Sequence, residues 1–116
     1  METIADDDGK GNGKAPFMRL WISDWQSSVL TMTAAQRGAH ISMLCYAWER
    51  GSCPADWTLL KRITGEIEGS ELEVVLERWV RDGDCWKNPR QERERKEVRF
   101  RHEKAVRAAG KRWSNA

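Results

Sequence analysis

The chain has 116 residues, which is enough for a single domain with one modest hydrophobic core. No apolar run approaches the roughly 20 residues of a membrane-spanning helix, and acidic residues rather than a signal peptide follow Met1, so a soluble cytoplasmic protein with no membrane partner is expected. The net charge is only +2, but residues 1–89 hold 10 Lys/Arg and 14 Asp/Glu (−4), whereas residues 90–116 hold 10 Lys/Arg and 4 Glu (+6).

Residues 1–15 are predicted to be a disordered leader, because they contain an acidic run and a glycine-rich stretch with almost nothing apolar to bury. The glycine-rich stretch does not fit a phosphate-binding loop, since the glycine spacing is wrong and Ala15 stands in place of Ser/Thr. The apolar run over residues 17–22 predicts a short strand, and residues 23–28 have the composition of a turn-rich connector.

The clearest helix is predicted over residues 33–50. Thr33 and Gln36 have the spacing of a capping box, and Gly51 is the usual residue to end a helix. One apolar face is expected from four residues at positions i, i+3, i+4 and i+7, namely Ile41, Leu44, Cys45 and Trp48. Most of the seven tryptophans of the chain are likewise expected in the core.

Two short helices are predicted next, one capped by Asp56 with Trp57 facing inward, and one over residues 70–79. Asp82-Gly83 then signals a hairpin turn. Asn88 followed by Pro89 predicts the start of a last helix that reaches about Ala109.

These elements favour a mostly helical α+β fold, a winged helix-turn-helix with an extended C-terminal basic helix. The expected organisation is a leader at residues 1–15, a winged-helix-like domain at 16–88, and a basic helix and tail at 89–116.

Several segments resemble a phage and prophage family catalogued as domain of unknown function 1376. They are residues 17–25 (FMRLWISDW), 30–33 (LTMT), 36–40 (QRGAH), 86–88 (WKN) and 108–113 (AAGKRW). The family is similar to the N-terminal domains of phage replication initiators and replisome organisers. The resemblance therefore implies a role in replication or DNA handling inside a bacterial host, with DNA and a replication protein as partners. His40 stands where the family more often has Tyr, so the resemblance assigns it no role.

No catalytic or metal site is predicted, and neither a cofactor nor a small-molecule substrate is expected. The two histidines and three cysteines lack the spacing of zinc ligands. Cys45 lies on the predicted apolar face, where a buried, inert thiol is expected. The chain is therefore not expected to be an enzyme.

The basic end of the chain is the first candidate for binding nucleic acid, because Lys and Arg neutralise phosphates. Phe100 and Trp113 could stack on bases if they are exposed. The alternative is a plain solvated helix with ion pairs such as Glu92–Lys96 and Glu103–Arg107. The candidate contact residues, including two in the hairpin, are Arg81, Lys87, Arg90, Arg93, Lys96, Arg99, Lys104, Arg107, Lys111 and Arg112.

The helix over residues 70–79 has the wrong charge for the usual docking into DNA. It carries Glu71, Glu73 and Glu77, and its single basic residue is Arg78. The alternative function is accordingly a protein-interaction adaptor that recruits a replication component through these three glutamates. A third use of the last helix is packing on its own domain or in a homodimer, through the narrow apolar stripe of Val98, His102, Ala105, Val106, Ala109 and Trp113.

Overall fold

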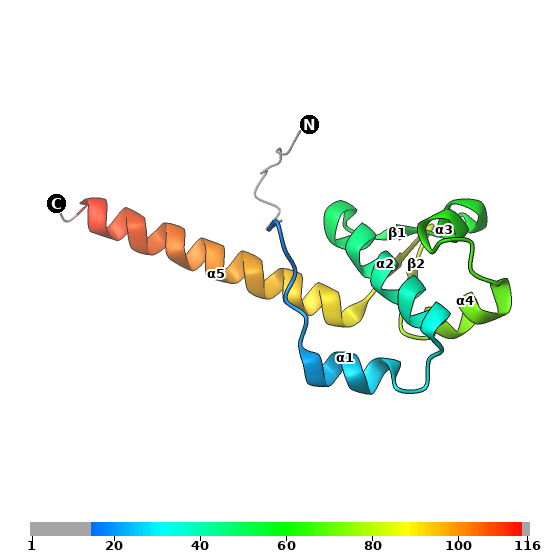
Figure 1. Cartoon of the computed structure of the whole chain (residues 1–116). Helices are drawn as coiled ribbons and strands as arrows, with labels where there is room; N and C mark the ends of the chain where they lie inside the picture. Colours follow the sequence, from blue (N-terminus) through cyan, green and yellow to red (C-terminus); the bar gives the residue numbers. More distant parts are fainter. Residues whose placement is uncertain (1–14, 115–116) are drawn as a thin grey trace. The chain divides into compact units, whose positions relative to one another are not determined.

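The computed structural model describes residues 15–114, so the predicted leader lies almost wholly outside the described residues. The described part is α+β and mostly helical, as the sequence predicted. It divides into two compact units, one formed by Arg19–Gln91 and the other including residues 15–18 and 92–114. Its elements (Figure 1) are α1 (Ile22–Val29), α2 (Ala34–Arg50), β1 (Cys53–Pro54), α3 (Trp57–Ile63), α4 (Gly69–Leu76), β2 (Val80–Asp82), β3 (Cys85–Lys87) and α5 (Pro89–Ser114).

Helix α2 confirms the strongest prediction, and both of its ends are formed by local signals. The Thr33 hydroxyl accepts a hydrogen bond from the Gln36 N–H at 3.2 Å, and the Gln36 side chain accepts one from the Thr33 N–H at 2.9 Å. This capping box satisfies two N–H groups that the first helical turn leaves without partners. Gly51 ends the helix in the left-handed conformation at φ 95°, which costs glycine little.

The predicted strand over residues 17–22 and the connector after it are wrong, because helix α1 begins at Ile22. A strand needs a neighbouring strand, and within the described residues only β1, β2 and β3 pair with one another. The helix is favoured instead by one face, where Trp25, Ser28 and Val29 follow the i, i+3, i+4 spacing. The Trp25 ring stacks on His40, and the Ser28 carbonyl accepts from Arg78, so long-range contacts stabilise this short helix.

Helices α3 and α4 confirm the two short helices, although α4 ends at Leu76 rather than at the predicted Trp79. The Asp56 carboxylate accepts from the Leu59 N–H at 3.0 Å and caps α3. Leu60 of α3 and Leu72 and Val75 of α4 are buried. Trp57, however, does not face the core: it is 45% exposed, and its ring lies against Gly69, where an added Cβ would come within 3.3 Å.

A hairpin follows α4, as predicted, but its sheet has a third strand that was not predicted. Strands β2 and β3 pair antiparallel through a two-residue loop, in which Gly83 has φ 65°. The short β1 pairs antiparallel with the other side of β3, with Cys53 opposite Trp86. The resulting strand order is β1-β3-β2.

Helix α5 starts as predicted. The Asn88 carboxamide oxygen accepts from the Gln91 N–H at 2.9 Å, and Pro89 occupies the first helical position. Its other end is later than predicted, since the helix continues past Ala109 to Ser114.

The core of the Arg19–Gln91 unit lies between α2, α3, α4 and the sheet. Its fully buried side chains include Met43, Cys53, Leu60, Leu72 and Val75. The expectation that most tryptophans are buried is wrong: Trp48 and Trp79 are buried, Trp25 and Trp86 are partly exposed, and Trp21, Trp57 and Trp113 are exposed. Aromatic residues therefore contribute both to the core and to the surface of this chain.

Candidate nucleic-acid interface

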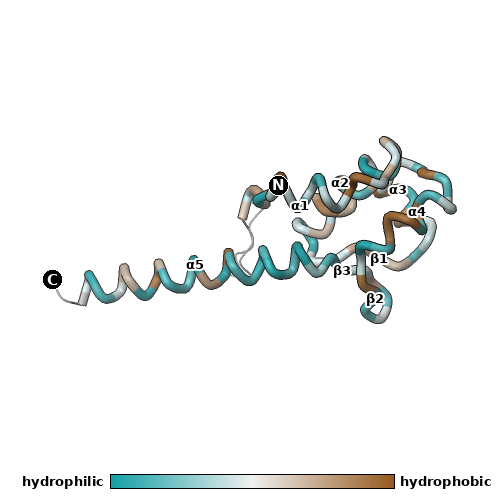
Figure 2. The backbone as a smooth tube through the Cα atoms, turned by 90° about the horizontal axis from the view of Figure 1, so that it is seen from below, coloured by the Kyte–Doolittle hydropathy of each residue, from teal (hydrophilic) through white to brown (hydrophobic). Residues whose placement is uncertain are grey.

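Helix α5 presents one straight row of basic side chains along its length, which we call the basic stripe. Successive positions of the row are three or four residues apart, so all of them share one helix face. The central position of the row is occupied by an aromatic residue instead of a basic one. All five basic side chains are exposed, and Figure 2 shows a largely hydrophilic helix. The basic stripe comprises Arg93, Lys96, Lys104, Arg107 and Lys111, with Phe100 in its middle.

The ion pairs of α5 differ from those that the sequence predicted. Arg95 pairs with Glu92 at 3.7 Å, and Arg101 pairs with Glu97 at 3.4 Å. The expected pairs Glu92–Lys96 and Glu103–Arg107 are wrong. Glu92 pairs with Arg95 instead, and no ion pair joins Glu103 to Arg107 among the described residues.

Four cations of the basic stripe are consequently available for a partner. In the described part of the chain, no carboxylate forms an ion pair with Arg93, Lys96, Lys104 or Arg107. Two further candidates on this helix, Arg99 and Arg112, project from other faces of α5 and do not belong to the basic stripe.

The hairpin candidates Arg81 and Lys87 are already engaged and do not form one site. Arg81 donates from Nε to the Gly83 carbonyl at 2.7 Å and lies over the Trp86 ring at 5.6 Å. Lys87 pairs with Asp82 at 3.2 Å. Arg81 is registered opposite Trp86, and Lys87 is opposite Val80, so the two side chains point to opposite faces of the hairpin.

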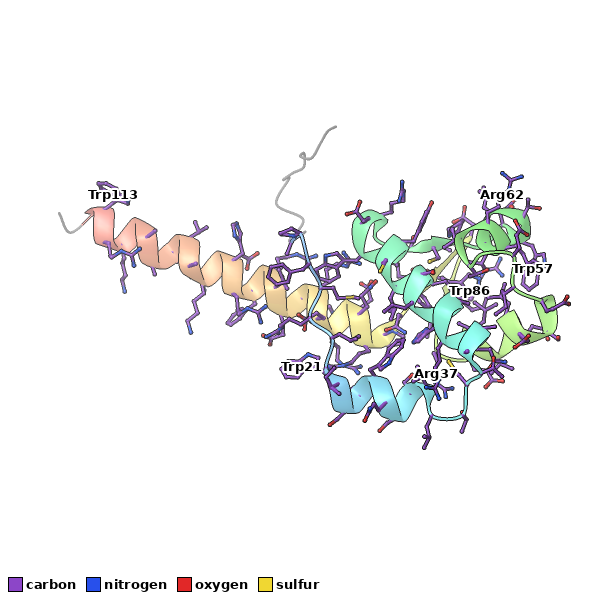
Figure 3. The ribbon with its side chains drawn as sticks, in the orientation of Figure 1. Trp21, Arg37, Trp57, Arg62, Trp86 and Trp113 are labelled. Carbon is purple, nitrogen blue, oxygen red and sulfur yellow. The ribbon has the colours of Figure 1, made fainter. Side chains whose placement is uncertain are left out.

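Arg90 is also held within the Arg19–Gln91 unit rather than presented on the basic stripe. Its guanidinium pairs with Asp24 at 2.7 Å and lies 5.8 Å from the ring of Trp21. A second guanidinium, that of Arg19, lies 5.1 Å from the same ring, which Figure 3 labels at the start of α1. The sequence reasoning missed this cluster, because its members come from distant segments.

The three glutamates of the adaptor hypothesis do not have the same surroundings. Glu71 accepts a hydrogen bond from the Thr33 hydroxyl at 3.0 Å, which ties α4 to the start of α2. Glu73 and Glu77 are exposed. Arg78 lies beyond the end of α4 and donates from Nε and Nη2 to the Ser28 carbonyl at 3.1 and 2.8 Å. Helix α4 therefore offers no cation to a phosphate.

His40, to which the sequence assigned no role, is a buried packing residue. It is 3% exposed, its ring stacks on Trp25 at 5.6 Å, and its Nδ1 accepts from Trp79 Nε1–H at 3.1 Å. Burial, with a contribution from the positive charge of Arg78, lowers the pKa of His40 from 6.5 to about 4. The imidazole is therefore neutral near pH 7, as its role of hydrogen-bond acceptor requires.

The cysteines differ from the prediction at one position. Cys45 is exposed, so the expected buried thiol is wrong there. Cys53 is the buried one: its thiol donates to the Met43 carbonyl at 3.3 Å, and burial, together with Cys85, raises its pKa to about 12. Within residues 15–114, no three His, Cys, Asp or Glu side chains gather as metal ligands would.

The apolar stripe of α5 is largely exposed to solvent. Val106 is 56% exposed and Trp113 is 81% exposed, and Figure 3 shows Trp113 at the last turns of the helix. His102 and Ala105 are also exposed, whereas Val98 and Ala109 are partly covered.

A groove of about 400 Å³ lies beside α2 in the Arg19–Gln91 unit. It runs past the small residues Ala35, Gly38 and Ser42 toward the end of α3, and Arg62 is its single charged lining residue. Its volume is at the lower end of the range for small-molecule sites.

Comparison with known proteins does not assign the chain to a family. No family model, no curated protein and no solved structure matches it. Within the described residues, no helix combines the length and apolar character that crossing a bilayer requires.

Proposed function

We propose that this chain binds nucleic acid through the basic stripe of α5. The observation that carries the proposal is the set of four exposed cations without ion pairs on one helix face. Residues 92–114 hold nine Lys/Arg and four Glu, a net charge of +5, so cations exceed what internal pairing can neutralise. A row of such charges attracts a phosphate backbone and releases its condensed counterions.

The dimensions of the basic stripe suit a polyanion better than a small ligand. Arg93 and Lys111 are 18 positions apart on one helix, about 27 Å at 1.5 Å per residue. A single phosphate or nucleotide would reach only one or two of the cations. A polynucleotide could contact all of them at once.

We further propose that residues 19–88 form a winged helix-turn-helix, in which α3 and α4 are the helix pair and β2–β3 the wing. The element order and the strand order β1-β3-β2 support this assignment. The basic stripe, rather than α4, then carries the affinity, because α4 holds two glutamates and no basic residue.

The biological setting is proposed from sequence resemblance alone. The segment 17–25 and the other motifs resemble a phage and prophage family, so we place this binding activity in phage replication or DNA handling in the bacterial cytoplasm. The chain would act there by binding and not by catalysis.

Neutralising the basic stripe tests the proposal. The triple variant Lys96→Gln, Lys104→Gln, Arg107→Gln should weaken polynucleotide binding on the order of 100-fold near 0.1 M salt, and the slope of log affinity against log salt should fall by about 2–3. Fluorescence anisotropy with labelled oligonucleotides at several salt concentrations measures both quantities.

A charge-matched control separates a local site from a general effect of net charge. The variant Arg50→Gln, Lys61→Gln, Arg62→Gln removes the same charge from the Arg19–Gln91 unit. It should change the affinity only a few-fold. Equal losses in the two triple variants, or no binding by the unaltered chain at low salt, would contradict the proposal.

The adaptor function remains a second candidate because Glu73 and Glu77 are exposed, and no ion pair in the described part of the chain involves them. If α4 recruits a replication protein, the variant Glu73→Lys, Glu77→Lys should no longer capture this partner from host extract. Glu71 is left unchanged because it bonds to Thr33. If the chain acts through nucleic acid instead, the variant should keep or increase its affinity for oligonucleotides.

A further inference from the structure

We infer that the basic stripe recognises single-stranded nucleic acid in preference to a duplex, with Phe100 stacking on an unpaired base. This inference rests on the proposed function and names the form of polynucleotide that the site takes. The observation behind it is the aromatic side chain at the centre of the row of cations.

Phe100 lies at the position on the stripe that a cation would otherwise occupy. Lys96 and Lys104 are four residues before and after it, about 6 Å along the helix axis, and Arg93 and Arg107 are seven residues away, about 10 Å. A strand whose phosphates contact these four cations would run along the helix face that carries Phe100.

Phe100 is an exposed large hydrophobic residue and does not belong to the buried core. Its side chain is 55% exposed, although burying an aromatic ring of this size is favourable. Among the described residues, no aromatic ring or guanidinium contacts it at stacking distance. The exposed ring is consequently available to a partner.

The chemistry of the ring favours a single strand. In a duplex the faces of the bases are covered by their stacked neighbours, and only the base edges reach the grooves. In a single strand the faces are accessible, and an aromatic side chain beside a cationic track can stack on them irrespective of sequence. DNA and RNA single strands share this chemistry.

Trp113 provides an internal comparison. It is the more exposed aromatic residue, at 81%, but it follows Val106 and Ala109 along the apolar stripe. No row of cations surrounds it on that face. Exposure alone would select Trp113 as the stacking residue, whereas its position relative to the phosphate-binding cations selects Phe100.

The experiment compares the full chain and its variants on labelled oligo(dT), oligo(U) and a hairpin duplex of matched length, by anisotropy at fixed low salt. Phe100→Ala should weaken single-strand binding about 5- to 150-fold, the range that one stacked base provides, and duplex binding less than about 2-fold. Phe100→Trp should retain the affinity. Val106→Ala is the matched control, because Val106 is equally exposed, at 56%, on the other face.

The outcomes distinguish this inference from the proposed function. If Phe100→Ala loses affinity for oligo(dT), oligo(U) or both, the inference is supported, and the affected oligonucleotide shows whether the site takes DNA, RNA or either. Binding that responds to the basic-stripe triple variant but is equal for Phe100→Ala and Val106→Ala overturns the inference and leaves the proposed function standing. Tighter binding to the duplex than to both single strands overturns it as well. If the basic-stripe triple variant binds these oligonucleotides as tightly as the unaltered chain does, both the inference and the proposed function are overturned.

Discussion

Replacing Trp79 by alanine is expected to lower the free energy of unfolding by about 3–5 kcal/mol. Trp79 is buried, and removing its indole leaves a cavity that the surrounding helices can only partly fill. The substitution also leaves the buried Nδ1 of His40 without its donor, which adds the cost of an unsatisfied polar atom.

Two further variants separate these contributions in urea titrations followed by circular dichroism. Trp79→Phe keeps most of the volume but removes the donor, and should cost about 1–3 kcal/mol. Trp113→Ala removes an exposed indole and should leave the midpoint nearly unchanged. If Trp79→Ala and Trp113→Ala shift the midpoint alike, the assignment of Trp79 to the core is wrong.

Acidification is the second large effect, and it acts through His40. The pKa of this residue is about 4 in the folded chain and near 6.5 when unfolded, so the unfolded state binds the proton more readily. The corresponding stability is complete above pH 6.5 and declines as the pH falls toward 4. The expected loss is about 2 kcal/mol at pH 5 and about 3 kcal/mol at pH 4. Protonation would also place an N–H of the imidazole against the N–H of Trp79.

The comparison variant is His40→Gln, which offers an acceptor oxygen but does not titrate in this range. The difference in unfolding free energy between the unaltered chain and this variant should shrink as the pH falls from 7 to 5. His102→Gln, which removes the exposed histidine, is the matched control. A difference between the unaltered chain and His40→Gln that is constant with pH would show that His40 does not couple folding to protonation.

The elements predicted correctly are those whose ends depend on neighbouring residues. Thr33 with Gln36, Asp56, and Asn88 with Pro89 each cap a helix within three residues, so a local pattern is sufficient to find them. The Asp82-Gly83 turn is equally local. By contrast, β1 has only two residues and forms because it pairs with β3. This contact cannot be predicted from a local sequence pattern. Helix α1 depends in the same way on Ser28 meeting Arg78, 50 residues later.

In the candidate site, too, local features could be predicted from the sequence and long-range contacts could not. The basic stripe could be predicted because residues that are three or four positions apart in a regular helix lie on the same face. The partners of individual cations could not, since Glu92 has both Arg95 and Lys96 within reach and the structure selects Arg95. Arg90 was assigned to the nucleic-acid site, but Asp24 and Trp21 hold it, and both are distant in sequence.

The short sheet has a consequence for how this chain behaves at high concentration. Its two outer strands, β1 and β2, are the edges at which another molecule could add a strand. Pro54 has no N–H to donate on β1, and Arg81 and Asp82 place charges on β2, which is only three residues long. Both edges thus resist the edge-to-edge pairing that leads to aggregation.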